Sequence, residues 1–297
     1  MNAALRAAFI LFILSGRFME HSLLAVYAHP DDEAFSTGGT IARYAAEGIK
    51  TFLVCATRGE VGEISDPSLA TPETLGQVRE GELRCAAETM GVAELIFLNY
   101  RDSGMVGTSE NQDPRAFINA PADEVIARLV TILRRLRPEV VATFEPNGGY
   151  GHPDHIAVHR HTVAAFHAAA QADFHPELGR PWQASRLLYT AIPRSFFIEM
   201  RRQLEELGED TSEFDRFDDT SAGWPDDQIH IHLDVSSTVN SKWEALNCHR
   251  TQFGPGNLFR RLPEERVKAL MSVEHFSLAW PEPKPGLQLS SLFAGLA

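Results

Sequence analysis

The chain has 297 residues, a formal net charge of -13, 44% hydrophobic residues and 23% charged residues. This composition is typical of a folded globular protein and excludes a disordered or fibrous one. The negative charge disfavours a nucleic-acid partner, because no basic stripe is available to neutralise phosphates. The length allows one large α/β domain with an elaborated end, or two domains that share a cleft.

The first residues resemble the start of a signal peptide, because Arg6 precedes an apolar run over residues 7–14. The run is too short to span a bilayer, and no A-x-A cleavage site follows it. Met19 lies just ahead of the first expected strand. We therefore expect residues 1–18 to be a non-native start or a disordered tail, with export or anchoring as the alternative, and we expect no membrane partner.

The cysteines are Cys55, Cys85 and Cys248, which are too few for a disulfide framework and too far apart for a C-x-x-C pair. We expect all three to be reduced, in a cytoplasmic protein. The sequence leaves open whether the chain forms a homo-oligomer.

Strand and helix signals alternate through the first two thirds of the chain, which predicts an α/β fold. We expect a Rossmann-like, doubly wound, mostly parallel sheet with helices on both faces. The expected strands cover residues 22–28, 49–56, 95–98, 140–144 and 187–192, and the expected helices cover residues 38–47, 71–91, 125–136, 155–170 and 239–250.

The predicted catalytic domain spans residues 19–200, and residues 201–297 form a smaller C-terminal elaboration that completes the cleft. The polar segment 101–121 is long enough to be a functional loop. The acidic stretch 205–227 is expected to be an exposed linker or cap, and it could also serve as a lid or subunit contact.

Two motifs follow directly after expected strands: residues 28–33 read AHPDDE, and residues 150–155 read YGHPDH. In doubly wound sheets, ligands bind beyond the carboxyl ends of the strands, where the strand order reverses. A strand order of 3-2-1-4-5 places that reversal between the first and fourth strands. The two motifs are therefore expected to meet.

Together the motifs offer His29, Asp32 and His155, two imidazoles and a carboxylate suited to Zn²⁺ or Fe²⁺ with coordination positions left open. Zinc is our first choice. Such a metal lowers the pKa of bound water toward about 7 and polarises a carbonyl, as amide hydrolysis requires. Asp31 is the natural general base, because its neighbour Asp32 is occupied by the metal.

Three further residues of the second motif have predicted roles. His152 would stabilise an oxyanion or protonate the leaving amine. Asp154 could accept the other N–H of a histidine and hold its tautomer. Tyr150 could add a mobile hydroxyl donor.

Simpler interpretations remain for each of these residues. The first motif could be a solvated turn with a helix N-cap, and the second could be a loop that enters a helix. His159, His161 and His167 are expected to be surface or packing residues. His230 and His232, on an expected strand beside Asp234, could form another metal site but lack a third ligand. His249 could reach the cleft.

At these motifs the sequence resembles the PIG-L/LmbE-like family of zinc-dependent N-acetylglucosaminyl deacetylases, over roughly residues 22–160. It is most similar to the deacetylases of low-molecular-weight thiol biosynthesis, of the mycothiol and bacillithiol types. The resemblance implies zinc on His29, Asp32 and His155, with Asp31 as base and His152 as the oxyanion or acid group. It also implies that Tyr150 is a mobile helper.

The mycothiol type further carries an R-x-x-E-L segment and an R-D-S-G-M segment, matched here at residues 79–83 and 101–105. The resemblance therefore implies that Arg79 and Asp102 bind the sugar. The alternative makes Arg79 a surface residue on an amphipathic helix. Residues 249–252 are similar to a late motif of mycothiol deacetylases and conjugate amidases, with no role assigned.

The leading hypothesis is a zinc-dependent N-deacetylase that releases acetate from a small N-acetylglucosamine conjugate such as GlcNAc-inositol or GlcNAc-malate. One alternative is a mycothiol-type S-conjugate amidase with the same metal. The other is a sugar- or nucleotide-binding module without catalysis, because a doubly wound sheet alone implies no function.

Overall fold

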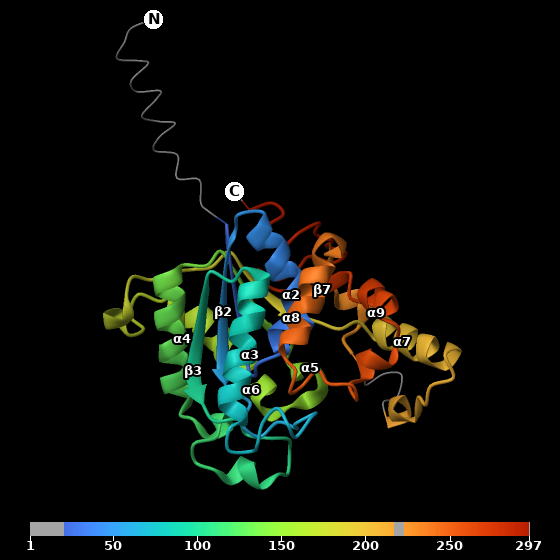
Figure 1. Cartoon of the computed structure of the whole chain (residues 1–297). Coiled ribbons are helices and arrows are strands. Elements are labelled where there is room, and N and C mark those ends of the chain that lie inside the picture. The colour runs from blue at the N-terminus through green and yellow to red at the C-terminus, as the bar shows by residue number, and fades with distance from the viewer. Residues whose placement is uncertain (1–20, 217–222, 297) are drawn as a thin grey trace, which may run out of the picture.

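A computed structural model describes residues 21–216 and 223–296 (Figure 1). The expectation for residues 1–18 lies outside the described residues. Within them, strands form one sheet in the order β3-β2-β1-β4-β5-β7-β6. The predicted order 3-2-1-4-5 and the mostly parallel α/β class are therefore confirmed, with two further strands at one edge.

The first five strands are parallel to one another, and β7 is antiparallel to both β5 and β6. The strands are β1 (Ser22–Tyr27), β2 (Lys50–Thr57), β3 (Glu94–Tyr100), β4 (Val140–Phe144), β5 (Arg186–Thr190), β6 (Ile231–Asp234) and β7 (Val273–Trp280). The helices are α2 (Asp32–Ala46), α3 (Leu75–Met90), α4 (Ala122–Leu136), α5 (Gly148–Gly151), α6 (Pro153–Ala169), α7 (Arg194–Glu206), α8 (Val239–Cys248) and α9 (Glu264–Leu270).

The centre of the sheet is β1 and β4, in which every residue is buried. Continuous apolar runs of this kind are typical of parallel strands that helices cover on both faces. The two strands pair in parallel, with Leu23 opposite Val140. Their carboxyl ends therefore lie side by side, at the point where the strand order reverses.

Two groups of helices cover the sheet. Helices α2, α3 and α8 pack against one another, and α4 packs against α6. Figure 1 shows α2, α3 and α8 side by side in front of the strands. Helix α4 carries acidic residues in its first turn and arginines in its last, which complements the helix dipole. None of the described helices is long and apolar enough to cross a membrane.

Some expected boundaries differ from the structure. Helix α3 begins at Leu75 rather than near Thr71, because residues 71–74 form a turn in which the Thr71 N–H donates to Thr74 Oγ1 at 2.9 Å. Helix α7 was not expected, and it reaches into the start of the acidic stretch. Strand β7 was also missed, because Glu274 interrupts its apolar pattern. That glutamate is buried and pairs with Lys242 of α8 at 2.6 Å.

The expectation that all three cysteines are reduced is wrong for two of them. Cys85 of α3 and Cys248 of α8 form a disulfide across a sequence separation of 163 residues, and Cys55 is a buried free cysteine. The two bonded residues are distant in sequence, but the packing of α3 on α8 brings them together. Spacing along the chain could not reveal that contact.

We predict that Cys248→Ser lowers the free energy of unfolding by about 2–4 kcal/mol, because a cross-link over a long loop restricts the unfolded chain. Urea denaturation under non-reducing conditions measures the loss. The matched variant Cys85→Ser and the double variant should show the same loss, since all three remove one bond. Additive losses, or three reactive thiols in the denatured wild-type protein, would contradict the bond.

Candidate metal and catalytic centre

The three predicted metal ligands meet at the adjoining ends of β1 and β4. His29 Nδ1 lies 3.1 Å from His155 Nε2. The carboxylate of Asp32 completes the group, with Oδ1 at 3.2 Å from His155 Nε2 and Oδ2 at 3.7 Å from His29 Nδ1. All three side chains are buried. The fold therefore joins residues that are more than a hundred positions apart in the chain.

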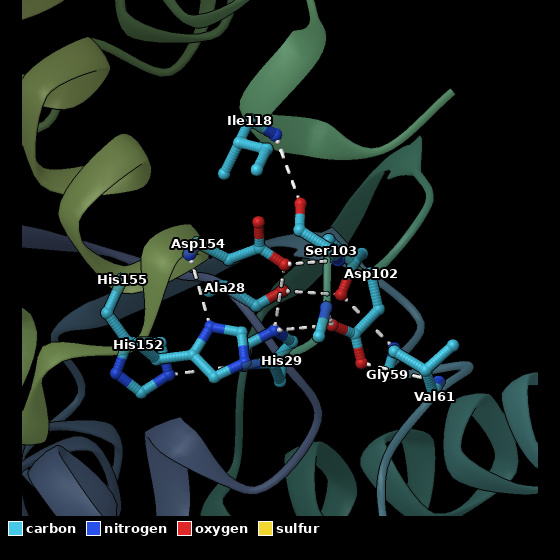
Figure 2. Close-up of polar contacts among 12 residues, drawn as sticks. Ala28, His29, Gly59, Val61, Asp102, Ser103, Ile118, His152, Asp154 and His155 are labelled. Carbon is cyan, nitrogen blue, oxygen red and sulfur yellow. Dashed lines mark hydrogen bonds and ion pairs between the residues drawn. The ribbon is translucent and has the colours of Figure 1, made fainter. Parts of the chain in front are cut away.

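The outer nitrogen of each imidazole already has a partner. His29 Nε2 lies 3.1 Å from Asp154 Oδ2 and 3.4 Å from Asp102 Oδ1, and His155 Nδ1 lies 3.1 Å from the Gly148 carbonyl oxygen. These acceptors place the ring protons on the outer nitrogens. Figure 2 shows the Asp102 and Asp154 carboxylates along one edge of the His29 ring, with His155 toward the other.

When both imidazoles are neutral, their inner nitrogens face the Asp32 carboxylate with their lone pairs, so three acceptors converge. A metal cation satisfies such a group, and without one a proton on His29 Nδ1 does so. A tetrahedral zinc ion with ligands at about 2.0–2.1 Å separates those ligands by about 3.3 Å. His155 Nε2 lies 3.1 Å from His29 Nδ1 and 3.2 Å from Asp32 Oδ1, close to that value, while Asp32 Oδ2 accepts the His29 backbone N–H at 2.7 Å. The donor set therefore fits a small divalent metal such as zinc.

Three neighbouring side chains also offer ligand atoms. His152 groups with His29 and His155, and Asp102 groups with His29 and Asp154, each set within 4.8 Å. However, Asp102 and Asp154 face the protonated edge of His29. His152 accepts the Asp154 backbone N–H at its Nδ1, at 3.1 Å. A neutral His152 therefore carries its proton on Nε2, where it could donate to a bound group.

Electrostatics at the centre favours a charged cluster. Burial lowers the pKa of His29, but the nearby carboxylates, Asp102 above all, outweigh it and raise that pKa well above its usual value. Burial raises the pKa of Asp32, yet His155 and His29 bring it well below its usual range. Burial beside His29 and His155 lowers the pKa of His152 to about 4.

Asp31 occupies a strained turn at the start of α2, with φ at 114°. Backbone strain of this kind persists only where surrounding contacts impose it, and it concentrates at functional sites. The Asp31 N–H donates to Glu33 Oε2 at 3.0 Å, and Asp31 Oδ1 lies 3.4 Å from Arg79 Nη2. Burial raises the pKa of Asp31 to about 6, with Arg79 opposing the shift.

Of the two predicted sugar-binding residues, Arg79 lies next to the Asp31 turn and Asp102 lies next to the His29 ring. Arg79 is 3% exposed, so the alternative that placed it on the surface is wrong. Its guanidinium also donates to the carbonyl oxygens of Gly59, at 3.0 Å, and Pro30. Asp102 is buried beside His29 and accepts the Gly104 N–H at 2.9 Å. Their binding of substrate stays a prediction.

Tyr150 lies on the rim of the centre. Its side chain is 65% exposed, and its ring is 5.0 Å from that of His155 in an edge-on arrangement. The loop that carries it is held by the buried carboxylate of Glu145, which accepts the N–H groups of Asn147 and Gly149 at 2.5 and 2.6 Å. The predicted mobile hydroxyl is thus within reach of the cluster.

The sequence assigned no role to Glu33, although it stands in the first motif, and none to Ser103. Glu33 is bound by His249, and Ser103 donates its N–H to Asp154 at 2.9 Å. His249 is fully buried and contacts the first motif through Glu33. His232 pairs with His275 rather than with His230, and no third ligand joins them among the described residues.

Comparison with known proteins identifies the family. The family described as "PIG-L: GlcNAc-PI de-N-acetylase" matches residues 24–166. A 1D-myo-inositol 2-acetamido-2-deoxy-alpha-D-glucopyranoside deacetylase of Geodermatophilus obscurus is 39% identical over 287 residues, or 92% of this chain and 97% of that protein. The chain belongs to the PIG-L family. Removal of an N-acetyl group is hydrolysis of an amide bond, so the expected class of enzyme is confirmed.

Other known proteins are also similar to this chain. A deacetylase of the same name from Catenulispora acidiphila is 40% identical over 92% of this chain and 89% of its own length. Among solved structures, the conserved protein TT1542 of Thermus thermophilus is 26% identical with a TM-score of 0.58, covering 90% and 96% of the two chains. The N,N'-diacetylchitobiose deacetylase of Pyrococcus horikoshii is 20% identical with a TM-score of 0.62 over 96% and 94%, which shows the shared fold.

We predict that Gly148→Ala weakens zinc binding by this PIG-L chain, because a Cβ at Gly148 would lie 2.6 Å from His155 Cβ. Gly149→Ala is the matched control, since both glycines have positive φ but the Gly149 Cβ would meet no atom within 4 Å. Competition against a zinc chelator measures the affinity. We expect a loss of about 10- to 100-fold for Gly148→Ala alone. Equal losses in both variants would point to backbone strain instead.

Proposed function

We propose that this chain removes the acetyl group from an N-acetylglucosaminyl inositol, releasing acetate and a free amine. One observation carries the proposal: His29, Asp32 and His155 converge with lone pairs facing inward, beside the strained Asp31. Full-length relatives whose names specify the inositol glycoside support that substrate over the malate glycoside.

The proposed ligands are His29, Asp32 and His155, with zinc as the metal and iron(II) as the alternative in the same donor set. When bound, such an ion lowers the pKa of a coordinated water and polarises the acetamide carbonyl. Asp154 accepts the His29 Nε2 proton and so keeps the Nδ1 lone pair directed inward.

In the proposed reaction, Asp31 takes the proton of the attacking water. Its carboxylate is available for this role because Asp31 is not one of the proposed metal ligands. His152 presents Nε2–H to the oxygen on which negative charge develops. Asp31 then gives the proton of the water to the leaving nitrogen as the carbon–nitrogen bond breaks, which releases acetate and the free amine. Tyr150, on its exposed loop, adds a hydroxyl donor to the same oxygen.

Arg79 and Asp102 have two proposed duties. Arg79 pairs with the carboxylate of the proposed base, Asp31, and Asp102 contacts the ring of the proposed ligand His29. Both residues therefore position groups that take part in the reaction. Their binding to sugar hydroxyls, which the family resemblance implies, requires that Arg79 and Asp102 contact the substrate as well as these protein groups.

The fold alone does not determine the reaction, since a hydratase, GalB of Pseudomonas putida, has a TM-score of 0.58 to this chain.

We predict that the zinc-loaded protein releases acetate faster from N-acetylglucosaminyl-inositol than from N-acetylglucosaminyl-malate or N,N'-diacetylchitobiose. Parallel assays that compare kcat/KM across the three compounds measure the preference. A mycothiol S-conjugate is the fourth substrate, and faster cleavage of its amide would assign the amidase activity instead. Bound zinc with no turnover of any compound would refute the proposal.

We predict that Asp31→Asn lowers kcat by about 10²- to 10⁴-fold, because the amide keeps the shape of the carboxylate but cannot accept the proton. Bound zinc, measured by elemental analysis, should remain at the wild-type level, since Asp31 is not a proposed ligand. His155→Ala is the comparison variant and should lose metal. Full activity in Asp31→Asn would exclude Asp31 as the base.

A further inference from the structure

A chain of buried contacts runs from the turn of Asp31 to a histidine in the last fifth of the sequence. Glu33 Oε2 accepts the Asp31 N–H at 3.0 Å. The other oxygen, Oε1, lies 2.7 Å from His249 Nε2. Glu33 is 1% exposed and His249 is 0% exposed, so bulk solvent does not reach the contact between them.

The segment that carries His249 is fixed in place on both sides. Cys248, the last residue of α8, is bonded to Cys85 of α3. Two residues after His249, Thr251 donates its N–H and its hydroxyl to the buried carboxylate of Glu82 of α3, at 2.8 and 2.6 Å. His249 therefore has little freedom to move away from Glu33.

Helix α3 also contacts the turn directly. Arg79 lies one helical turn before Glu82, and it reaches the Pro30 carbonyl oxygen and the Asp31 carboxylate. The turn is thus held from one side by Arg79 and from the other by Glu33 and His249. Arg79 belongs to α3 and His249 directly follows α8, whereas Glu33, which His249 contacts, belongs to α2.

We propose that His249 is a positioning residue for the general base: it orients Glu33, and Glu33 holds the backbone of Asp31 in its strained conformation. This inference rests on the proposed function, in which Asp31 takes the proton of water. Without the His249 donor, the buried Glu33 carboxylate would lose a charge-assisted hydrogen bond. Glu33 would then seek another donor, and the Asp31 turn would relax toward an unstrained conformation.

The experiment compares His249→Leu with His249→Gln. Leucine removes the donor, whereas the glutamine amide can present an N–H near the position of Nε2. We expect His249→Leu to lower kcat by about 10- to 100-fold, with KM and bound zinc close to wild type, and His249→Gln to recover most of the loss. Glu33→Gln tests the same contact from the other partner and replaces His249→Leu if that variant does not fold.

Loss of general stability is controlled by Arg134→Met. Arg134 is a buried donor to the carbonyl oxygens of Ala169 and His175, and it contacts no residue of the site. This variant should lower the melting temperature while kcat of the folded protein stays unchanged. A fall in kcat that follows melting temperature across all variants would overturn the positioning role.

A double-mutant cycle with Asp31→Asn identifies the residue through which His249 acts. If His249 acts through Asp31, adding His249→Leu to Asp31→Asn should lower the residual activity by less than about 3-fold. Additive losses, or wild-type kcat in His249→Leu, would overturn this inference while Asp31 remains the base. An active Asp31→Asn variant would instead refute the proposed base, so the two failures are distinguishable.

Discussion

The hydrogen bond between His29 Nε2 and Asp154 joins the two halves of the site, and the remaining geometry depends on it. It links residues that are 125 positions apart, one after β1 and one in the first turn of α6. Because it fixes a proton of His29 on the outer nitrogen, the inner nitrogen of the neutral ring is the one left to accept. The same carboxylate also takes the Ser103 N–H, which ties the loop after β3 to the centre.

The parallel sheet determines where the site lies, and the segments that follow its strands carry the side chains proposed to react. Adjacent parallel strands end at the same edge, so any two strands that flank the reversal of strand order bring their following residues together. Here the three proposed ligands among those residues are close together and buried, and the backbone of Asp31 is strained. The cost of that strain, of order 1–3 kcal/mol, is offset by the contacts that Glu33 and Arg79 make with the turn.

The sequence predicted much of the first two thirds of the fold because its signals there are local. Apolar runs mark β1 and β4, and the glycine at position 91 marks the end of α3, where the structure has φ at 76°. The meeting of His29 with His155 followed from topology. The pairing of Cys85 with Cys248 and the burial of Arg79 did not, because both depend on how α3 packs against other elements.

The last third of the chain was harder to predict for a related reason. Its strands and helices complete a structure that the earlier elements begin, so their polar residues have partners far away in sequence. Glu274 interrupts the apolar pattern of β7 but is paired with Lys242 and accepts the Gly39 N–H of α2. Such a glutamate is buried and paired in the folded protein, but the sequence alone does not distinguish it from a glutamate that is exposed to solvent.

His249 illustrates the same limit at the site itself. It lies outside residues 24–166, the part that the PIG-L family match covers, yet it binds a residue of the first motif. Relatives that align over about nine tenths of the chain include this region. The catalytic motifs therefore form one part of the centre, and the C-terminal segment forms the other: the first supplies the reacting groups, and the second holds the turn on which the proposed base stands.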